Sequence, residues 1–236
     1  MKKYILSLCF IPLFLSCNKT IIDDKEIIED HVLTKEDQQN LTPDKVIDDL
    51  KKGNQDFIKD NLTIRNNTNR VRSASLGQYP EAVVLSCLDS RVPVEDVFHK
   101  AIGELFVARV AGNIVNDDIL GSLEFACKVS GSKVIVVLGH EHCGAIKSSI
   151  EGVRLGYITS VLEKIEPAVN QAKKEFKGVQ SSDNDQFVEK VCDLNVINSI
   201  NQIRNKSEIL SQMEKDGSIK IVGAVYDMTT GKVDFL

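Results

Sequence analysis

Uninterrupted runs of apolar residues recur through the last two thirds of the chain, each bounded by glycine or by polar residues. Runs of this length and composition predict buried strands. The run before Gly139 shows no polar alternation, which is typical of a central parallel strand with helices on both of its faces. The predicted strands cover residues 81–86, 105–110, 133–139, 219–226 and 233–235.

Between these runs, apolar residues return at helical spacing. Thr42, Pro43 and Asp44 form a helix start, with a capping side chain, a proline in the first position and an acid in the first turn. Pro167 should break or bend the helix that contains it. The order of elements predicts an α/β fold with a mostly parallel central sheet flanked by helices. The predicted helices cover residues 42–59, 117–130, 144–150, 155–177, 185–202 and 206–215, with a short helical turn at 95–98 and a polar connection over 66–78.

The N-terminal segment follows a different pattern. Residues 1–3 carry two lysines, and residues 4–15 are apolar but shorter than the roughly 20 residues of a membrane-spanning helix. We interpret residues 1–17 as an export signal; a short membrane anchor is the alternative, which the length disfavours. The end of this segment, Leu13 to Cys17, resembles a bacterial lipobox, although Phe14 stands where leucine is usual. The resemblance implies that Cys17 is lipidated and becomes the mature N-terminus.

Residues 18–40 are polar, strongly charged and without a clear apolar period. Such a composition predicts a flexible tether rather than a packed element. The remaining residues, 41–236, are enough for one domain with a sizeable core. The segment order therefore predicts an exported lipoprotein, anchored to a membrane at Cys17 and displayed on its periplasmic or cell-surface side.

The net charge of the chain argues against one class of binding partner. The chain has 236 residues with 29 basic and 34 acidic side chains, a formal charge of −5. Loss of Lys2 and Lys3 with the signal would take the charge from −5 to −7. An acidic chain without a basic block argues against nucleic acid as a partner.

The six cysteines have different surroundings. Cys9 lies inside the predicted signal and Cys17 is the predicted lipid site. Cys127 and Cys192 lie among apolar residues at helical spacing, which favours buried thiols over a disulfide, although an exported protein could form one. The other two cysteines, at positions 87 and 143, each follow a predicted strand and are candidates for chemistry.

Cys87, His140 and Cys143 follow two predicted strands, and ligands gather at the carboxyl ends of parallel strands. Two thiolates and one imidazole suit zinc, and three protein ligands leave the fourth position for water, as in a catalytic zinc site. His142 could compete as the nitrogen ligand, but a direct neighbour of Cys143 reaches the same metal poorly. We therefore interpret His142 as a solvent-facing or outer residue.

Asp89 and Arg91 alternate with Cys87, so in extended chain all three side chains point the same way. Arg91 should keep Asp89 ionised and oriented. Asp89 could accept a proton from water at the metal, or could move onto the metal as a fourth ligand in a closed state. An ordinary ion pair at a strand end is the alternative interpretation.

Taken together, these motifs resemble those of the β-class carbonic anhydrases, over residues 42–236. The resemblance implies zinc on Cys87, His140 and Cys143, and reversible hydration of carbon dioxide (carbonate dehydratase activity) by zinc-bound hydroxide, assisted by an Asp89–Arg91 dyad. The motifs that carry it are Cys87-x-Asp89-Ser90-Arg91-Val92-Pro93, Leu105-Phe106-Val107-x-Arg109, Ala111-Gly112-Asn113, Gly121-Ser122-Leu123-Glu124-Phe125-Ala126 and Gly139-His140-x-x-Cys143-Gly144-Ala145.

The same resemblance carries further expectations. It implies a homodimer or homotetramer with the active site close to the subunit interface, and a substrate pocket that includes Val107, Gly144 and Ala145. Some family members have a noncatalytic bicarbonate site that uses a tryptophan. The chain contains no tryptophan, so we do not expect regulation of that form.

Three alternative functions would each need different residues or a different substrate pocket. A hydrolase of carbon disulfide or carbonyl sulfide would share the fold and the metal, and would differ in pocket access. A lipid-tethered zinc-binding protein without catalysis would not need Asp89 and Arg91. A thiol redox protein is disfavoured because the chain lacks a Cys-x-x-Cys motif.

Overall fold

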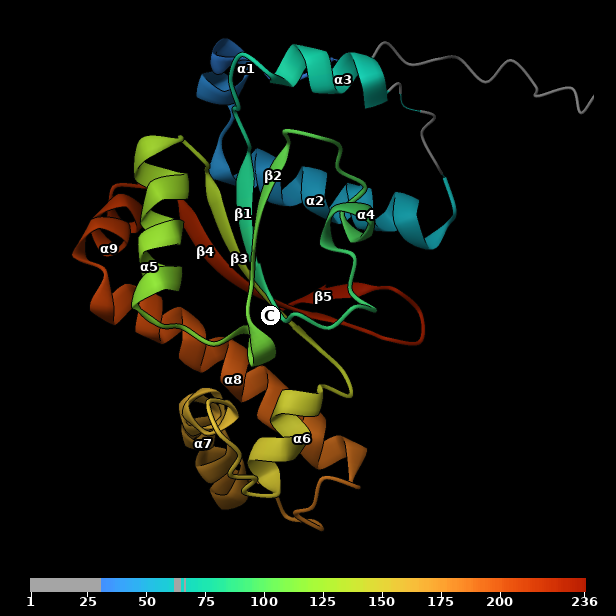
Figure 1. Cartoon of the computed structure of the whole chain (residues 1–236), viewed down its shortest axis with the longest axis vertical. Coiled ribbons are helices and arrows are strands. Elements are labelled where there is room, and N and C mark those ends of the chain that lie inside the picture. Colours follow the sequence, from blue (N-terminus) through green and yellow to red (C-terminus); the bar gives the residue numbers. More distant parts are fainter. Residues whose placement is uncertain (1–30, 62–64, 66) are drawn as a thin grey trace, which may run out of the picture.

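The computed structural model describes residues 31–61, 65 and 67–236. The predicted signal and most of the predicted tether lie outside the described residues. Within them, β1 (Ala82–Ser86), β2 (Leu105–Arg109), β3 (Val134–His140), β4 (Lys220–Tyr226) and β5 (Val233–Phe235) form one sheet in the order β2-β1-β3-β4-β5 (Figure 1). The first four strands are parallel and β5 is antiparallel to β4. The predicted α/β fold with a mostly parallel sheet is confirmed.

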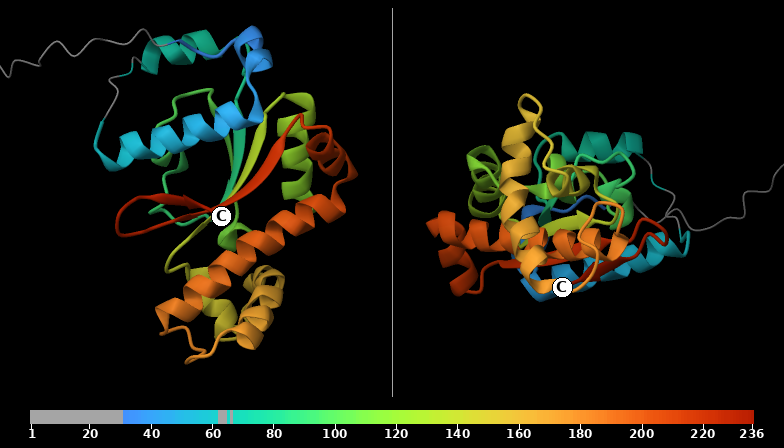
Figure 2. Two further views of the ribbon diagram at one scale, coloured as in Figure 1. Left: turned by 180° about the vertical axis from the view of Figure 1, so that it is seen from behind. Right: turned by 90° about the horizontal axis from the view of Figure 1, so that it is seen from below.

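Alternate side chains of the strands enter two different apolar clusters, so the sheet is buried from both sides. Val83 and Leu85 of β1 face one cluster, whereas Val84 faces the other. The first cluster is covered by α5 (Asp117–Glu124), the π-helical turn η2 (Phe125–Val129), α8 (Asp185–Lys206) and α9 (Glu208–Lys215). The second is covered by α2 (Pro43–Ile58) and α4 (Val94–Val97), which lie across the opposite face (Figure 2).

A third apolar cluster lies beyond the carboxyl ends of the strands. It is built by α6 (Gly144–Ile150), α7 (Ile158–Glu175) and the first half of α8, which extend below the sheet in Figure 1. Of the break or bend predicted at Pro167, the break is wrong, because α7 continues through this residue. Gly139 lets α8 approach β3 closely, since a Cβ there would lie 2.7 Å from Val196 and 2.9 Å from the Cys192 sulfur.

The end of the predicted tether is folded, which corrects the expected start of the domain. Residues Lys35–Asn40 form α1, whose first turn is capped by Thr34 and Asp37. The buried Gln38 amide donates hydrogen bonds to the carbonyls of Pro80 and Ser130, at the amino ends of β1 and β3. The pattern of apolar residues missed this helix because a polar side chain, rather than an apolar face, attaches it to the sheet.

The segment expected to be a connection also contains a helix, α3 (Asn67–Ala74). Its Arg70 side chain is only 3% exposed and forms an ion pair with Glu104 at 2.7 Å. The same guanidinium donates to the carbonyls of His31 and Ile102. The expectation failed for the same reason as at α1, since a buried charge attaches α3 to the domain.

None of the helices within the described residues combines the length and apolar character that crossing a bilayer requires.

Candidate metal centre

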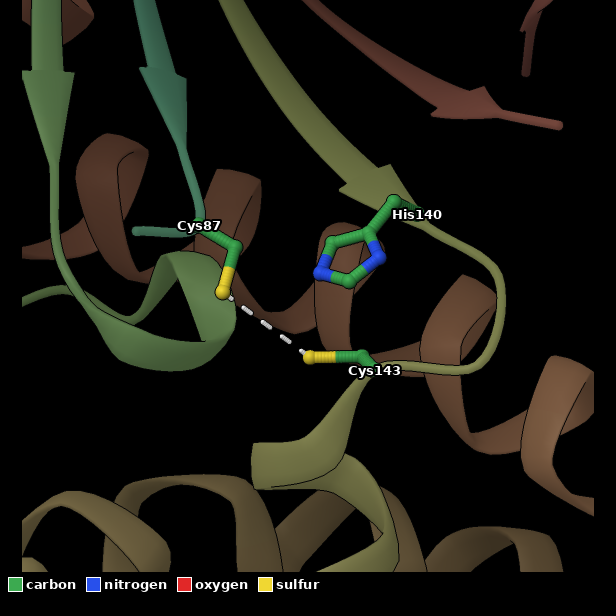
Figure 3. Close-up of side chains that lie close together, drawn as sticks. All are labelled: Cys87, His140 and Cys143. Carbon is green, nitrogen blue, oxygen red and sulfur yellow. Dashed lines mark hydrogen bonds between the residues drawn. The ribbon is translucent and has the colours of Figure 1, made fainter. Parts of the chain in front are cut away.

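Three side chains meet where β1 and β3 end (Figure 3). Cys87 follows β1 directly, His140 is the last residue of β3, and Cys143 is the N-cap of α6. Because β1 and β3 are paired parallel strands, their carboxyl ends lie at the same edge of the sheet. The two sulfurs and an imidazole nitrogen lie within 4.8 Å of one another. Each of the three residues is at most 5% exposed.

The geometry of this cluster fits a tetrahedral zinc ion. The two Sγ atoms are 4.0 Å apart, and two thiolates on tetrahedral zinc, with bonds of about 2.3 Å, would lie about 3.8 Å apart. Nδ1 of His140 lies 2.8 Å from the Glu141 carbonyl oxygen, so Nδ1–H donates there and the lone pair remains on Nε2. Nε2 is buried and has no hydrogen-bond partner among the described residues, as expected of a nitrogen that binds a metal.

The two thiols of the cluster titrate as a pair. A hydrogen bond from the Cys143 thiol lowers the pKa of Cys87 to about 4, although burial opposes this shift. The same hydrogen bond, with burial and the charge on Cys87, raises the pKa of Cys143 above its usual range. The two pKa values move in opposite directions, so loss of a first proton from the pair is favoured and loss of the second is disfavoured. A second thiolate requires a cation between the sulfurs, which is what a metal ion provides.

Asp89 and Arg91 form a bidentate ion pair beside the cluster. Arg91 donates from Nε to one carboxylate oxygen at 2.9 Å and from a terminal nitrogen to the other at 2.7 Å. These hydrogen bonds hold the pKa of Asp89 well below its usual range. Asp89 Oδ2 lies 3.9 Å from His140 Nε2, so the carboxylate is close to the ligand set.

The route by which Arg91 reaches Asp89 differs from the expected one. The alternation of an extended chain predicts that the side chains of Asp89 and Arg91 point the same way, but Ser90 and Arg91 lie in a turn. The backbone N–H of Arg91 donates to the Asp89 carboxylate at 3.0 Å, and the N–H of Val92 donates to the Asp89 carbonyl. The turn thus brings the two side chains together where alternation alone would not.

Arg109 also contributes to this region, a role that its place in a family motif did not reveal. It ends β2, which pairs with β1, and its guanidinium donates to the carbonyls of Cys87 and Asp89 at 3.0 and 2.5 Å. Two arginines therefore hold one loop, Arg91 through a side chain and Arg109 through the backbone. Its position at the carboxyl end of a neighbouring strand is the signal that could have identified it.

The remaining residues singled out from the sequence lie around the cluster. His142 is outside it, with its ring Nδ1 3.3 Å from a carboxylate oxygen of Asp185 and its side chain 41% exposed. Gly144 and Ala145 begin α6 directly after Cys143. Val107 lines a hollow of about 590 Å³ between β2 and α5, and no ligand residue contributes to its lining.

The other two described cysteines, Cys127 and Cys192, are free and buried, which confirms the expectation of buried thiols. Burial raises the pKa of each to about 12. The Cys192 thiol donates to the His140 carbonyl at 3.4 Å, directly behind the cluster. These thiols are therefore neutral packing groups.

Comparisons with known proteins agree on one family. The family model described as carbonic anhydrase matches residues 82–233. Carbonic anhydrase 2 of Mycobacterium tuberculosis is 31% identical over 189 residues, which cover 78% of this chain and 87% of that protein. The carbonic anhydrase of Mycolicibacterium smegmatis is 33% identical over 191 residues, or 78% of this chain and 89% of that protein.

Two solved structures show the same similarity in three dimensions. The β-carbonic anhydrase CafA of Aspergillus fumigatus is 26% identical with a TM-score of 0.65, and the match covers 72% of this chain and 81% of that one. The Coccomyxa β-carbonic anhydrase, solved in complex with acetazolamide, is 27% identical with a TM-score of 0.64 and covers 72% and 77%.

Proposed function

Because this chain belongs to the carbonic anhydrase family, we propose that it hydrates carbon dioxide at one zinc ion bound by Cys87, His140 and Cys143. The two solved structures described above are of the β class. The activity, interconversion of carbon dioxide with bicarbonate and a proton, follows from the family. The observation that best supports the metal ligands is the buried His140 Nε2, which is unpartnered among the described residues and lies beside two sulfurs 4.0 Å apart.

The residues of the cluster determine the properties of the proposed centre. When bound, zinc lowers the pKa of water and supplies a nucleophile near neutral pH, an effect for which carbonic anhydrases are the standard example. Two thiolates would neutralise the charge of the ion. The Glu141 carbonyl fixes the tautomer of His140, and the Gly112 N–H donates to the Cys87 sulfur at 3.3 Å.

Asp89 is the proposed hydrogen-bond acceptor of the site. Its depressed pKa keeps it ionised at neutral pH, so it can only accept hydrogen bonds. In this role it orients a water molecule next to the ligand set by accepting a hydrogen bond from it. Movement of Asp89 onto the metal as a fourth ligand would require loss of both side-chain hydrogen bonds from Arg91. The dyad therefore favours the open form of the site.

Stopped-flow hydration of carbon dioxide by the purified full chain, with its metal measured in the same sample, tests this function. We expect one zinc per chain, loss of hydration when a strong chelator removes it, and recovery when zinc returns. Hydration that persists in a zinc-free sample, or a zinc-loaded chain without hydration, contradicts the proposal.

The family resemblance implies a homodimer or homotetramer, and we also propose that the second copy of the chain covers the β2 edge of the sheet. β2 is half-exposed and pairs only with β1 among the described strands. Two apolar side chains near this edge are exposed, Leu88 by 61% and Phe125 by 51%, and Phe125 lines the hollow beside β2. Large exposed apolar groups near an open sheet edge are typical of an interface between chains.

Sedimentation equilibrium of the full chain in detergent tests this interface. We expect a dimer, or a tetramer built from it, and a shift toward monomer in Phe125→Glu. Val179→Glu is the matched control, because Val179 is another apolar residue, 70% exposed, in a different region of the chain. A monomeric native chain contradicts the proposal.

The predicted lipid anchor at Cys17 remains a proposal, since it lies outside the described residues. Its support is the order of basic, apolar and Ser16-Cys17 segments in the sequence. More than one acyl chain is needed for firm anchoring. Expression of the native chain and Cys17→Ala in a bacterium, with lipid labelling and fractionation, tests it. An unlabelled native chain in the cytosol contradicts export and leaves the metal chemistry unaffected.

A further inference from the structure

The turn η1 (Ala111–Asn113), which follows β2, has an unusual backbone. Gly112 has φ +68° and Asn113 has φ +41°, and both residues are buried. Left-handed conformations at consecutive residues persist only where the surrounding structure holds them in place. A side chain at position 112 would also be excluded, because a Cβ there would lie 2.6 Å from Cδ1 of Ile165.

This turn supplies a donor to the proposed metal centre. The backbone N–H of Gly112 points at the Sγ atom of Cys87, with 3.3 Å between nitrogen and sulfur. A donor aimed at a thiolate withdraws charge from the sulfur and fixes its direction, which tunes the bond to a metal. The orientation of one peptide group therefore affects a ligand of the proposed zinc ion.

Two buried side chains of α8 hold the turn from the other side. Asn195 Nδ2 donates to the Gly112 carbonyl at 2.8 Å, and Ser199 Oγ donates to the Asn113 carbonyl at 3.1 Å. These side chains are four residues apart and lie on one face of the helix. They are 2% and 1% exposed, and their hydrogen-bonding groups serve the turn, not their own helix.

We propose that Asn195 and Ser199 are positioning residues for the metal centre, acting through η1 on the Cys87 sulfur. By binding the carbonyls of Gly112 and Asn113 they fix the left-handed turn, and the turn aims the Gly112 N–H at the sulfur. The inference rests on the proposed zinc site. It assigns a role in metal retention to a helix that contributes no ligand.

The experiment compares Asn195→Ala and Ser199→Ala with the native full chain, and uses Asn201→Ala as the matched control. Asn201 is an exposed asparagine of the same helix. Outer partners of metal ligands contribute roughly 10- to 100-fold in metal affinity. We expect zinc transfer to a competing chelator to be about tenfold faster in Asn195→Ala, with a smaller increase in Ser199→Ala and none in the control. In the cobalt-substituted chain, the sulfur-to-cobalt charge-transfer absorption should shift in the same order.

A purely structural role for the two side chains would give a different result. Asn195→Ala and Ser199→Ala would then melt at a lower temperature but keep the native zinc transfer rate and cobalt spectrum, and this outcome would overturn the proposal. If Asn195→Ala does not fold, the zinc transfer rate and cobalt spectrum of Ser199→Ala test the proposal in its place.

Failure of the metal site itself can be separated from failure of this inference. If the native chain binds neither zinc nor cobalt, the proposed function is wrong. Hydrogen exchange of the Gly112 amide in metal-free protein then decides whether α8 positions the donor. Faster exchange in Asn195→Ala than in the native chain and the control supports the inference, and unchanged exchange contradicts it.

Discussion

Polar side chains are buried at both ends of the sheet, but their bonding partners differ between the two ends. At the amino ends of the strands, Arg70 pairs with Glu104, Lys100 pairs with Glu81, and Gln38 spans two carbonyls. At the carboxyl ends, the buried His140 Nε2 has no hydrogen-bond partner within the described chain. At the amino end each buried charge faces an opposite charge, whereas the carboxyl end presents ligand atoms toward one point.

This contrast distinguishes buried polar groups that stabilise the fold from buried polar groups that bind a ligand. A buried side chain that is paired with one of opposite charge attaches one helix or strand to another and needs no additional ligand. Buried ligand atoms that face one another without an opposite charge require a cation. Substitutions at the two ends should therefore affect different measurements: stability at the amino end, and metal content and activity at the carboxyl end.

The largest effect is expected from Cys143→Ser. This substitution removes a thiolate from the proposed ligand set, and we expect loss of most of the bound zinc and of hydration activity. Cys127→Ala, which alters a buried thiol outside the cluster, is the control and should keep the native zinc content. Full zinc occupancy in Cys143→Ser, measured by elemental analysis, would show that the ligand assignment is wrong.

Arg70→Met should have the next largest effect, on stability alone. It leaves the Glu104 carboxylate, 19% exposed, without the arginine that faces it, and breaking such a pair costs about 3 kcal/mol. Urea denaturation measures the change, and zinc per folded chain should stay at the native level. Lys52→Met, which breaks the exposed Lys52–Asp56 pair, should change stability little. An equal loss in both variants would contradict a special role for the buried pair.

Asp89→Asn should separate metal binding from catalysis at the carboxyl end. The amide carries no charge and presents a donor where the carboxylate presents only acceptors, and we expect native zinc content with hydration near neutral pH reduced roughly a hundredfold. Asp96→Asn, on the exposed side of α4, is the control. A native rate in Asp89→Asn would mean that Asp89 is only the ion-pair partner of Arg91.

The smallest effect is expected at Asp37, in the cap of α1. Hydrogen bonds from Thr34 lower the pKa of Asp37 from 3.8 to about 2. Because the folded-state pKa is depressed, the stabilising contribution is present above the ordinary value of 3.8 and is lost as the pH falls toward 2. Hydrogen exchange of α1 amides in the native chain and Asp37→Asn should differ at pH 6, and the difference should shrink at pH 3. A difference that does not depend on pH would rule out the carboxylate as its source.

The two ends also differ in how far the sequence predicts them. At the carboxyl end, the apolar runs predict where the strands lie. Cys87 and His140, which directly follow two of these runs, lie close to Cys143 in the structure. These features are visible locally because strand ends and donor types can be read directly from the chain. At the amino end, α1 and α3 were missed, since Gln38 and Arg70 attach them by polar contacts that have no periodic signature.

Within the site itself, the sequence does not reveal which distant side chains support each ligand. Arg109 and Asn195 act on backbone carbonyls of other segments, and any donor with the right reach could do the same. The choice of the His140 nitrogen depends on one carbonyl, Glu141 O, whose direction is set by the folded loop. Such contacts depend on tertiary geometry rather than on residue type.

The position of β2 at the edge of the sheet has a consequence for the order of folding. Because β2 and β3 lie on opposite sides of β1, the chain between them must cross β1 before β3 can pair with it, and only this long-range pairing brings together the sulfurs of Cys87 and Cys143, which are 56 positions apart. Contacts between distant segments form late, because the loop between them must close first. During refolding, zinc uptake should therefore follow assembly of the sheet rather than precede it, and the metal would then stabilise a topology that the chain has already found.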